Sequence, residues 1–90
     1  MSVSTTGTTI TVRVLLFAQL RDWAGTDELA GSLPSGSTGA DLMRWLSQRS
    51  PKAQGLLKVS RLAVNCEYVA LDHRLDDGDE VVVLPPVSGG

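Results

Sequence analysis

The chain has 90 residues, a formal net charge of -2 and a single cysteine, Cys66. This length allows one domain with a modest core, and the charge provides no broad basic surface for nucleic acid. A lone cysteine forms no internal disulfide and builds neither a zinc site nor a four-thiolate iron–sulfur cluster by itself. The sequence shows no basic-then-apolar leader and no apolar run near the roughly 20 residues of a membrane helix. We therefore expect a cytoplasmic protein that binds neither nucleic acid nor membrane.

The first predicted element is a strand that follows a polar lead. Residues 1–9 are mostly Ser, Thr and Gly and bury little apolar surface, so we expect a flexible N-terminal lead. The domain is expected to span residues 10–90. From Ile10 to Phe17 an alternating pattern becomes apolar on both faces, which is typical of a strand that enters the centre of a sheet.

A hairpin is expected next. Residues 18–24 contain good helix formers and are followed by Gly25, so they predict a turn or one short helix. Residues 27–33 then predict a second, weaker strand, which Pro34 ends.

One main helix follows the hairpin. Thr38 and Asp41 have the spacing of a capping box, in which side chains satisfy free backbone donors, so the helix should begin there. Its apolar stripe consists of Leu42, Met43 and Leu46. Pro51 should end it.

The last third of the chain predicts three more extended segments after a helical turn at residues 53–57. They are a strand at 62–65, a short piece at 68–71 and a strand at 80–84. The last is apolar on both faces and follows the turn-forming Asp77-Gly78-Asp79 run, which indicates a central position. This order predicts an α+β fold with one main helix packed across one face of a mixed sheet.

The last six residues, Pro85-Pro86-Val87-Ser88-Gly89-Gly90, cannot contribute a core. Two prolines stiffen the exit from the strand, and two glycines lack the Cβ that would block passage through a narrow channel. Composition alone favours a disordered tail. The alternative is a slender end that is presented to another protein.

Five stretches of the sequence carry a resemblance to a known family. Four are Val12–Ala18 with the following Gln19–Asp22, the Leu33-Pro34 pair, the helix start at 38–42, and Ala63-Val64-Asn65. The fifth and most specific is 75–90, where an acidic turn, an apolar strand, a double proline and Gly-Gly occur in fixed order. From Ile10 to its end, the chain resembles the small, sulfur-carrying subunits of molybdopterin synthase.

The resemblance implies a β-grasp, ubiquitin-like fold and a carrier function. An ATP-dependent, E1-like adenylating enzyme would convert the Gly90 carboxylate to an acyl adenylate, and a sulfur donor would convert this to a thiocarboxylate. The large subunit of molybdopterin synthase would then bind the tail beside a cyclic pyranopterin monophosphate. Two sulfur transfers would build the dithiolene of the molybdenum cofactor.

The resemblance also assigns roles to the tail. Gly89 would thread the narrow passage to the activating site, and the contacts to the partner would come from Leu84, Pro85, Pro86, Val87 and Ser88. The chain would bind no cofactor or metal and would not be an enzyme on its own. It would work in a heterotetramer of two small and two large subunits. Gly39 stands where relatives usually have a β-branched residue, so we expect a weaker first helical turn.

Two alternatives remain open. Sulfur carriers for cysteine or thiamine biosynthesis share the fold and the Gly-Gly end. A β-grasp interaction module with an inert tail belongs to a different class.

Several other residues are expected to have structural roles. Cys66 should be a small buried hydrophobe rather than a reactive thiol, and His73 a solvated loop residue. Trp45 should be partly buried against the core. The acidic cluster does not have the spacing of a calcium loop, and turn formation explains Asp77 and Asp79.

Overall fold

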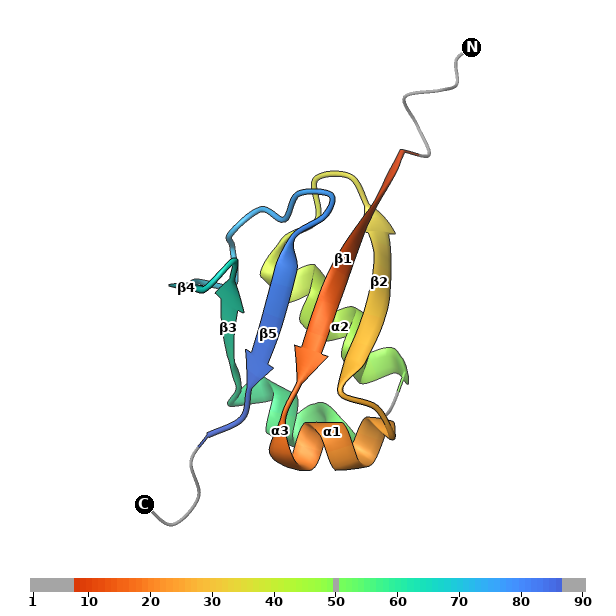
Figure 1. The fold of residues 1–90 in the computed structure, drawn as a ribbon, viewed down its shortest axis with the longest axis vertical. Coiled ribbons are helices and arrows are strands. Elements are labelled where there is room, and N and C mark those ends of the chain that lie inside the picture. The colour runs from red at the N-terminus through yellow and green to blue at the C-terminus, as the bar shows by residue number, and fades with distance from the viewer. Residues whose placement is uncertain (1–7, 50, 87–90) are drawn as a thin grey trace.

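The structure, a computed structural model, describes residues 8–49 and 51–86. Its five strands form one mixed sheet in the order β2-β1-β5-β3-β4 (Figure 1). β1 (Thr9–Leu16) and β5 (Glu80–Leu84) pair in parallel. β2 (Glu28–Pro34) pairs antiparallel with β1, whereas β3 (Arg61–Val64) pairs antiparallel with both β5 and β4 (Glu67–Val69). The predicted central position of the last strand is therefore confirmed.

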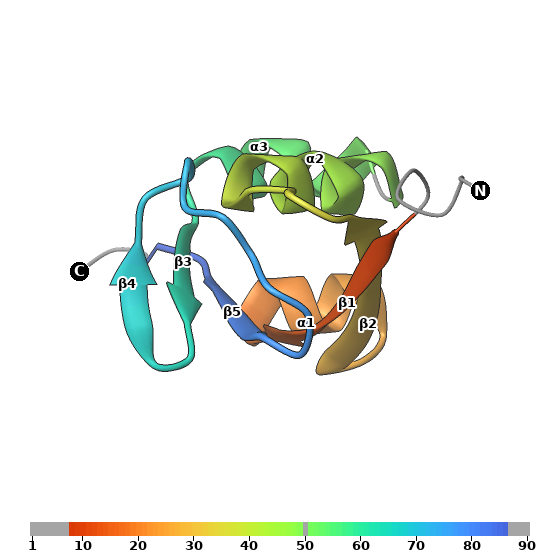
Figure 2. The ribbon, with the colours of Figure 1, turned by 90° about the horizontal axis from the view of Figure 1, so that it is seen from above.

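The helices lie on one face and at one end of this sheet. α2 (Gly39–Arg49) and α3 (Gln54–Lys58) cover the same face, and the 3-10 turn η1 (Pro51–Ala53) lies between them in the chain (Figure 2). α1 (Ala18–Ala24) crosses the end of the sheet at which β1 and β5 finish (Figure 1). The arrangement confirms the predicted α+β, β-grasp fold with one main helix, to which α1 and α3 add short helices. Within the described ranges, no helix is long and apolar enough to cross a membrane.

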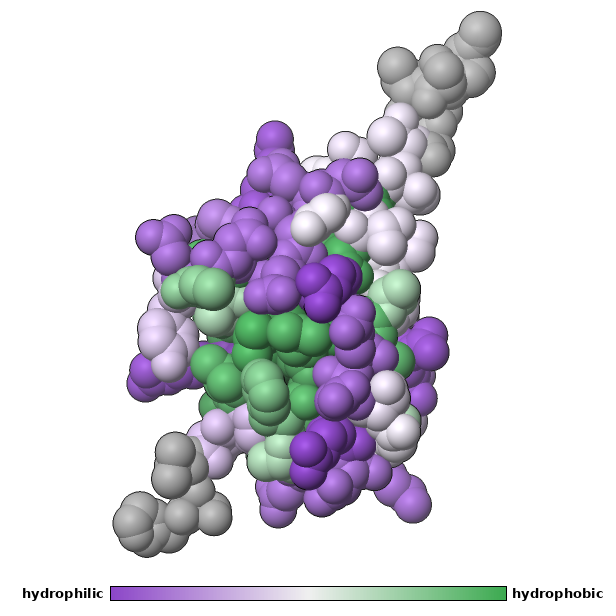
Figure 3. Space-filling view, in the orientation of Figure 1, coloured by the Kyte–Doolittle hydropathy of each residue, from purple (hydrophilic) through white to green (hydrophobic). Residues whose placement is uncertain are grey.

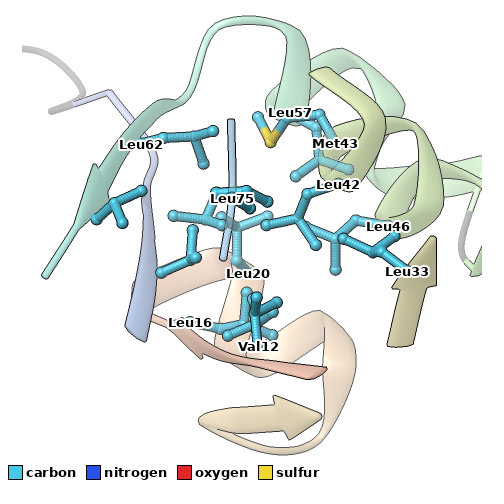
Figure 4. Packing of buried hydrophobic residues seen from close by; sticks show 14 of the residues in the cluster. Val12, Leu16, Leu20, Leu33, Leu42, Met43, Leu46, Leu57, Leu62 and Leu75 are labelled. Atoms are coloured by element: carbon cyan, nitrogen blue, oxygen red, sulfur yellow. The ribbon is translucent and has the colours of Figure 1, made fainter. Parts of the chain in front are cut away.

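The core lies between the sheet and α2. Alternate residues of β1 point inward, and Val12, Val14 and Leu16 are completely buried. Figure 4 shows Val12 and Leu16 on one side of the core and the apolar stripe of α2 on the other, with Leu20 and Leu75 between them. The stripe is the predicted set, Leu42, Met43 and Leu46. Two apolar surfaces are thus removed from water, which is the main stabilising term for a domain of this size.

The predicted capping box forms at the start of α2. The backbone N–H of Thr38 donates to the Asp41 carboxylate at 2.9 Å, and the N–H of Asp41 faces the Thr38 hydroxyl at 3.4 Å. The hydrogen bond from the Thr38 backbone, followed by that from Arg44, lowers the pKa of Asp41 below its usual value. The charged carboxylate therefore stabilises the helix start.

Gly39 has a packing role that the sequence did not indicate. A Cβ at this position would lie 2.6 Å from Cδ1 of Leu62 and 3.2 Å from the carbonyl oxygen of Leu71. The N–H groups of Gly39 and Ala40 donate to the carbonyls of His73 and Leu71. Glycine therefore lets the loop before β5 approach the first turn of α2 closely.

Several strand boundaries differ from the sequence prediction by one or two residues, and β2 and β3 were predicted at 27–33 and 62–65. β1 begins at Thr9, and the carbonyl of Thr8 accepts a hydrogen bond from Ser35 N–H at 3.0 Å. The sheet therefore includes the end of the segment predicted as a lead, while residues 1–7 lie outside the described part. The strand predicted at 68–71 occupies Glu67–Val69, because a two-residue turn after Val64 places Glu67 opposite it.

Candidate functional site

The central strand of the sheet leads to the candidate site. β5 is held between β1 and β3, and its inward residues Val81 and Val83 are completely buried. Its last residue, Leu84, is half-buried and pairs with Arg61 of β3. Pro85 is half-buried and Pro86 is exposed. The predicted site residues Val87, Ser88, Gly89 and Gly90 lie outside the described residues, and the structure describes the chain up to Pro86.

The acidic turn before β5 fixes the start of the strand. Asp77 accepts a hydrogen bond from the backbone N–H of Thr11 at 2.7 Å, and Gly78 N–H donates to the Thr11 carbonyl at 2.8 Å. The Asp79 carboxylate accepts from Asp76 N–H and from the side-chain amide of Asn65. These bonds confirm that Asp77 and Asp79 form the turn. Among residues 8–49 and 51–86, no group of three His, Cys, Asp or Glu side chains is arranged to hold a metal ion.

The sheet face opposite α2 carries an apolar surface. Figure 3 shows apolar residues gathered over β1 and β5 on this face. Leu15 and Val82 are neighbours in the parallel ladder, and both are half-buried. Phe17, directly after β1, has 46% of its surface exposed. We name Leu15, Phe17, Val82 and Leu84 the open-face patch. A partner that covered it would gain the free energy of removing apolar surface from water.

Charged groups border this patch toward the start of β5. The guanidinium of Arg13 donates to Glu28 at 3.1 Å and to Glu80 at 3.3 Å. The hydrogen bond to Glu28 raises the pKa of Arg13. These three residues lie on adjacent strands β2, β1 and β5 and cross-link them. The apolar surface is therefore limited on this side by a charged row, as in many protein interfaces with a polar rim.

A hollow opens where β5 ends. It has a volume of about 460 Å³ and is lined by Val59, Arg61, Tyr68, Leu84, Pro85 and Pro86. Tyr68 and Val59 expose 71% and 58% of their surfaces. We call this feature the exit hollow, since Pro85 and Pro86, which follow β5 in the chain, line it.

The sequence prediction named Leu84, Pro85 and Pro86 but missed the other residues of the open-face patch and of the exit hollow. Phe17 was treated only as part of a strand, and Val59, Arg61 and Tyr68 were given no role. Because successive side chains of a strand point to opposite faces of the sheet, the sequence of β5 could have indicated that Val82 and Leu84 face away from the core. The neighbours of these residues depend on strand order and register, which local patterns do not contain.

The remaining candidates have structural positions. The expectation that Cys66 is buried was wrong. Asn65 and Cys66 form the turn between β3 and β4, with φ angles of 49° and 75°. Cys66 is exposed. His73 is an exposed loop residue, as predicted. Trp45 is partly buried against the core, which confirms its prediction, and the Arg49 guanidinium lies 4.7 Å from its ring centre.

Comparisons with known proteins agree on one group. A family model described as the ThiS family matches residues 14–90. The molybdopterin synthase sulfur carrier subunit of Escherichia coli (strain K12) is 41% identical over 83 residues, and the match covers 88% of this chain and 99% of that protein.

Solved structures give the same result. The putative molybdopterin converting factor, subunit 1, of Pyrococcus furiosus is 36% identical with a TM-score of 0.78, and the match covers 87% of this chain and 99% of that chain. A complex of subunits 1 and 2 of the molybdopterin-converting factor from Helicobacter pylori contains a chain that is 26% identical. Its TM-score is 0.59, with 90% of this chain and 100% of that chain covered.

Proposed function

Because the chain belongs to the ThiS family and, within it, to the molybdopterin synthase sulfur carrier subunits, we propose that it delivers sulfur for molybdenum cofactor biosynthesis from the carboxylate of Gly90. The agreement between the family match and relatives named as carriers supports this role most strongly. The chain acts as the non-catalytic, sulfur-donating subunit of a sulfurtransferase.

The proposed chemistry begins by activating the Gly90 carboxylate, because a free carboxylate reacts poorly with nucleophiles. An E1-like adenylating enzyme joins the Gly90 carboxylate to the AMP part of ATP and releases pyrophosphate. A sulfur donor then displaces AMP, and the carboxylate becomes a thiocarboxylate. Since the activating step consumes ATP, we propose that it takes place in the cytoplasm. Gly89, which has no side chain, allows the end of the chain to reach the adenylating site.

In the second half of the cycle, the thiocarboxylate sulfur attacks cyclic pyranopterin monophosphate bound to the large subunit. Transfer of the sulfur to the substrate, with oxygen from water replacing it on Gly90, returns the carboxylate. Two such transfers supply both sulfur atoms of the dithiolene. Acid–base groups and the binding site for the substrate phosphate belong to the large subunit. The described part of the small subunit holds the start of the tail in place, since β5, which precedes the tail, lies at the centre of the sheet.

The open-face patch and the exit hollow are the proposed docking surface. Leu84 and Pro85 connect the two features, and Pro86, Val87 and Ser88 continue toward the terminus. The Helicobacter pylori complex supports a large-subunit partner for a chain of this fold. We propose a working enzyme of two small and two large subunits.

Purification of the untagged chain from its own cells tests this function. A large synthase subunit should co-purify, and the intact mass should show a fraction with one oxygen replaced by sulfur. Recovery of a cysteine or thiamine biosynthetic enzyme would instead assign the carrier to another pathway. If no preparation carried the sulfur, and deletion of Gly90 left molybdopterin formation unchanged, the chain would instead be an interaction module with an inert tail.

A further inference from the structure

The exit hollow combines apolar walls with one cationic side chain. Val59, Leu84, Pro85 and Pro86 provide apolar surface, while Arg61 and Tyr68 provide polar groups. Tyr68 and Val59 are among the large hydrophobic residues that remain exposed. Such a surface favours contact with a protein segment, because removing the tyrosine ring and the aliphatic groups from water lowers the free energy.

Arg61 has no counter-ion among the described residues. The ion pairs of residues 8–49 and 51–86 use Arg13 and Arg44, and no described hydrogen bond involves the Arg61 side chain. The residues that line the hollow include no acid. The hollow is therefore locally positive on a chain whose formal net charge is -2.

A guanidinium in such surroundings favours a carboxylate ligand. Arginine presents several N–H groups in a planar fork, which matches the two oxygens of Asp or Glu. Contact with a partner would remove water from both groups and strengthen their attraction. The apolar walls would at the same time take up an uncharged side chain next to the acid.

We infer that the exit hollow receives a segment of the large subunit in which an apolar side chain adjoins a carboxylate, and that Arg61 pairs with this carboxylate. This inference rests on the proposed function, because it takes the large subunit as the partner. Arg61 thereby acts as a specificity residue at the base of the tail. It attracts an acidic surface to a chain that is acidic overall, and so it fixes which part of the partner meets β5.

Three variants separate this role from a general charge effect. Arg61→Glu reverses the charge in the hollow, and Arg61→Lys keeps the charge but loses the planar fork. Arg74→Glu is the matched control, because it makes the same change in net charge at an exposed loop residue before β5 that does not line the hollow. Circular dichroism and the melting temperature should show that all three fold like the parent, since both arginines are exposed.

Calorimetric titration of each purified full-length variant with the purified large subunit measures the effect. We expect Arg61→Glu to raise the Kd by about tenfold or more, as close charge pairs at protein interfaces do. Arg61→Lys should have a smaller effect, and Arg74→Glu should change the Kd by less than about threefold. Added salt should weaken binding of the parent more than binding of Arg61→Glu.

Lysine substitution of acidic residues on the large subunit completes the test. One such variant should bind Arg61→Glu more tightly than it binds the parent. The inference is overturned, with the proposed function intact, if the parent binds the large subunit and Arg61→Glu binds as well as Arg74→Glu. Failure of the parent itself to bind the large subunit would instead overturn the proposed function. Self-association of the parent that Arg61→Glu abolishes, without an effect on the large subunit, would assign the hollow to a second copy and also overturn the inference.

Discussion

Alanine at position 39 would show whether packing or helix propensity decides stability at the start of α2. The added Cβ would lie 2.6 Å from Cδ1 of Leu62, a residue that is only 1% exposed, so the Leu62 side chain would have to shift within the core. It would also lie 3.2 Å from the Leu71 carbonyl oxygen. That carbonyl accepts a hydrogen bond from Ala40 N–H at 2.8 Å, so moving it would weaken the contact that completes the helix start.

The two opposing effects have known sizes. Replacing glycine by alanine in a helix gains at most about 1 kcal/mol, and less in a first turn. Forcing a methyl group into a packed site costs about 1–3 kcal/mol. We therefore expect Gly39→Ala to lower the free energy of unfolding by about 1 kcal/mol. For a domain of this length, that change lowers the melting temperature by about 4–8 °C.

Gly55→Ala is the matched control. Gly55 lies within α3, and a Cβ there would meet nothing within 4 Å. The same substitution should therefore raise the free energy of unfolding, by less than about 1 kcal/mol because Gly55 also lies in a first turn. Urea denaturation with linear extrapolation measures both variants. If Gly39→Ala stabilised the protein as Gly55→Ala does, the packing explanation would be refuted.

The helix cap, the turn after β3 and the docking surface each give one further prediction. The pKa of Asp41 is lowered by folding. Its stabilising effect is therefore present above about pH 4 and is lost as the pH falls through the folded pKa. Asp41→Asn should remove this part of the acid dependence in urea titrations across pH. Cys66→Gly should raise the free energy of unfolding by about 1 kcal/mol, since Cys66 has a φ of 75 that glycine adopts without strain. Val87→Asp should weaken binding to the large subunit without lowering the melting temperature, and an unchanged Kd would place the interface elsewhere.

Much of the fold could be predicted from local sequence patterns. The alternation of apolar and polar residues identifies β1, and a run that is apolar on both faces identifies β5 as central. Both patterns reflect the burial of individual residues. Thr38 and Asp41 predict the start of α2, since their hydrogen bonds join neighbours in the chain. The order of features from Leu75 onward indicates the family without any knowledge of contacts in the fold.

Features that depend on distant residues could not be predicted in this way. Thr11 and Asp77 are joined by a hydrogen bond although 66 positions separate them. The lack of space at Gly39 depends on Leu62 and on the loop before β5. Cys66 looked like a strand residue, but the chain reverses at Asn65 and Cys66, which turns its side chain to solvent.

No local sequence pattern predicts the exit hollow. It exists because β3 places Arg61 beside Leu84, while β4 places Tyr68 opposite Ala63. These pairings are set by the sheet register. The sequence could therefore predict the end of the chain as the reactive segment, but not the surface beside it.

The proposed function resides in the carboxylate of Gly90, so the most direct measurement is the intact mass of the chain after incubation with ATP, the activating enzyme and a sulfur source. The parent should gain one sulfur in place of one oxygen and then lose it when the large subunit and cyclic pyranopterin monophosphate are added. A variant with one residue added after Gly90 should keep its mass and its melting temperature and should produce no molybdopterin. If this extended variant supported molybdopterin formation as well as the parent does, without being trimmed back to Gly90, the carrier mechanism would be contradicted.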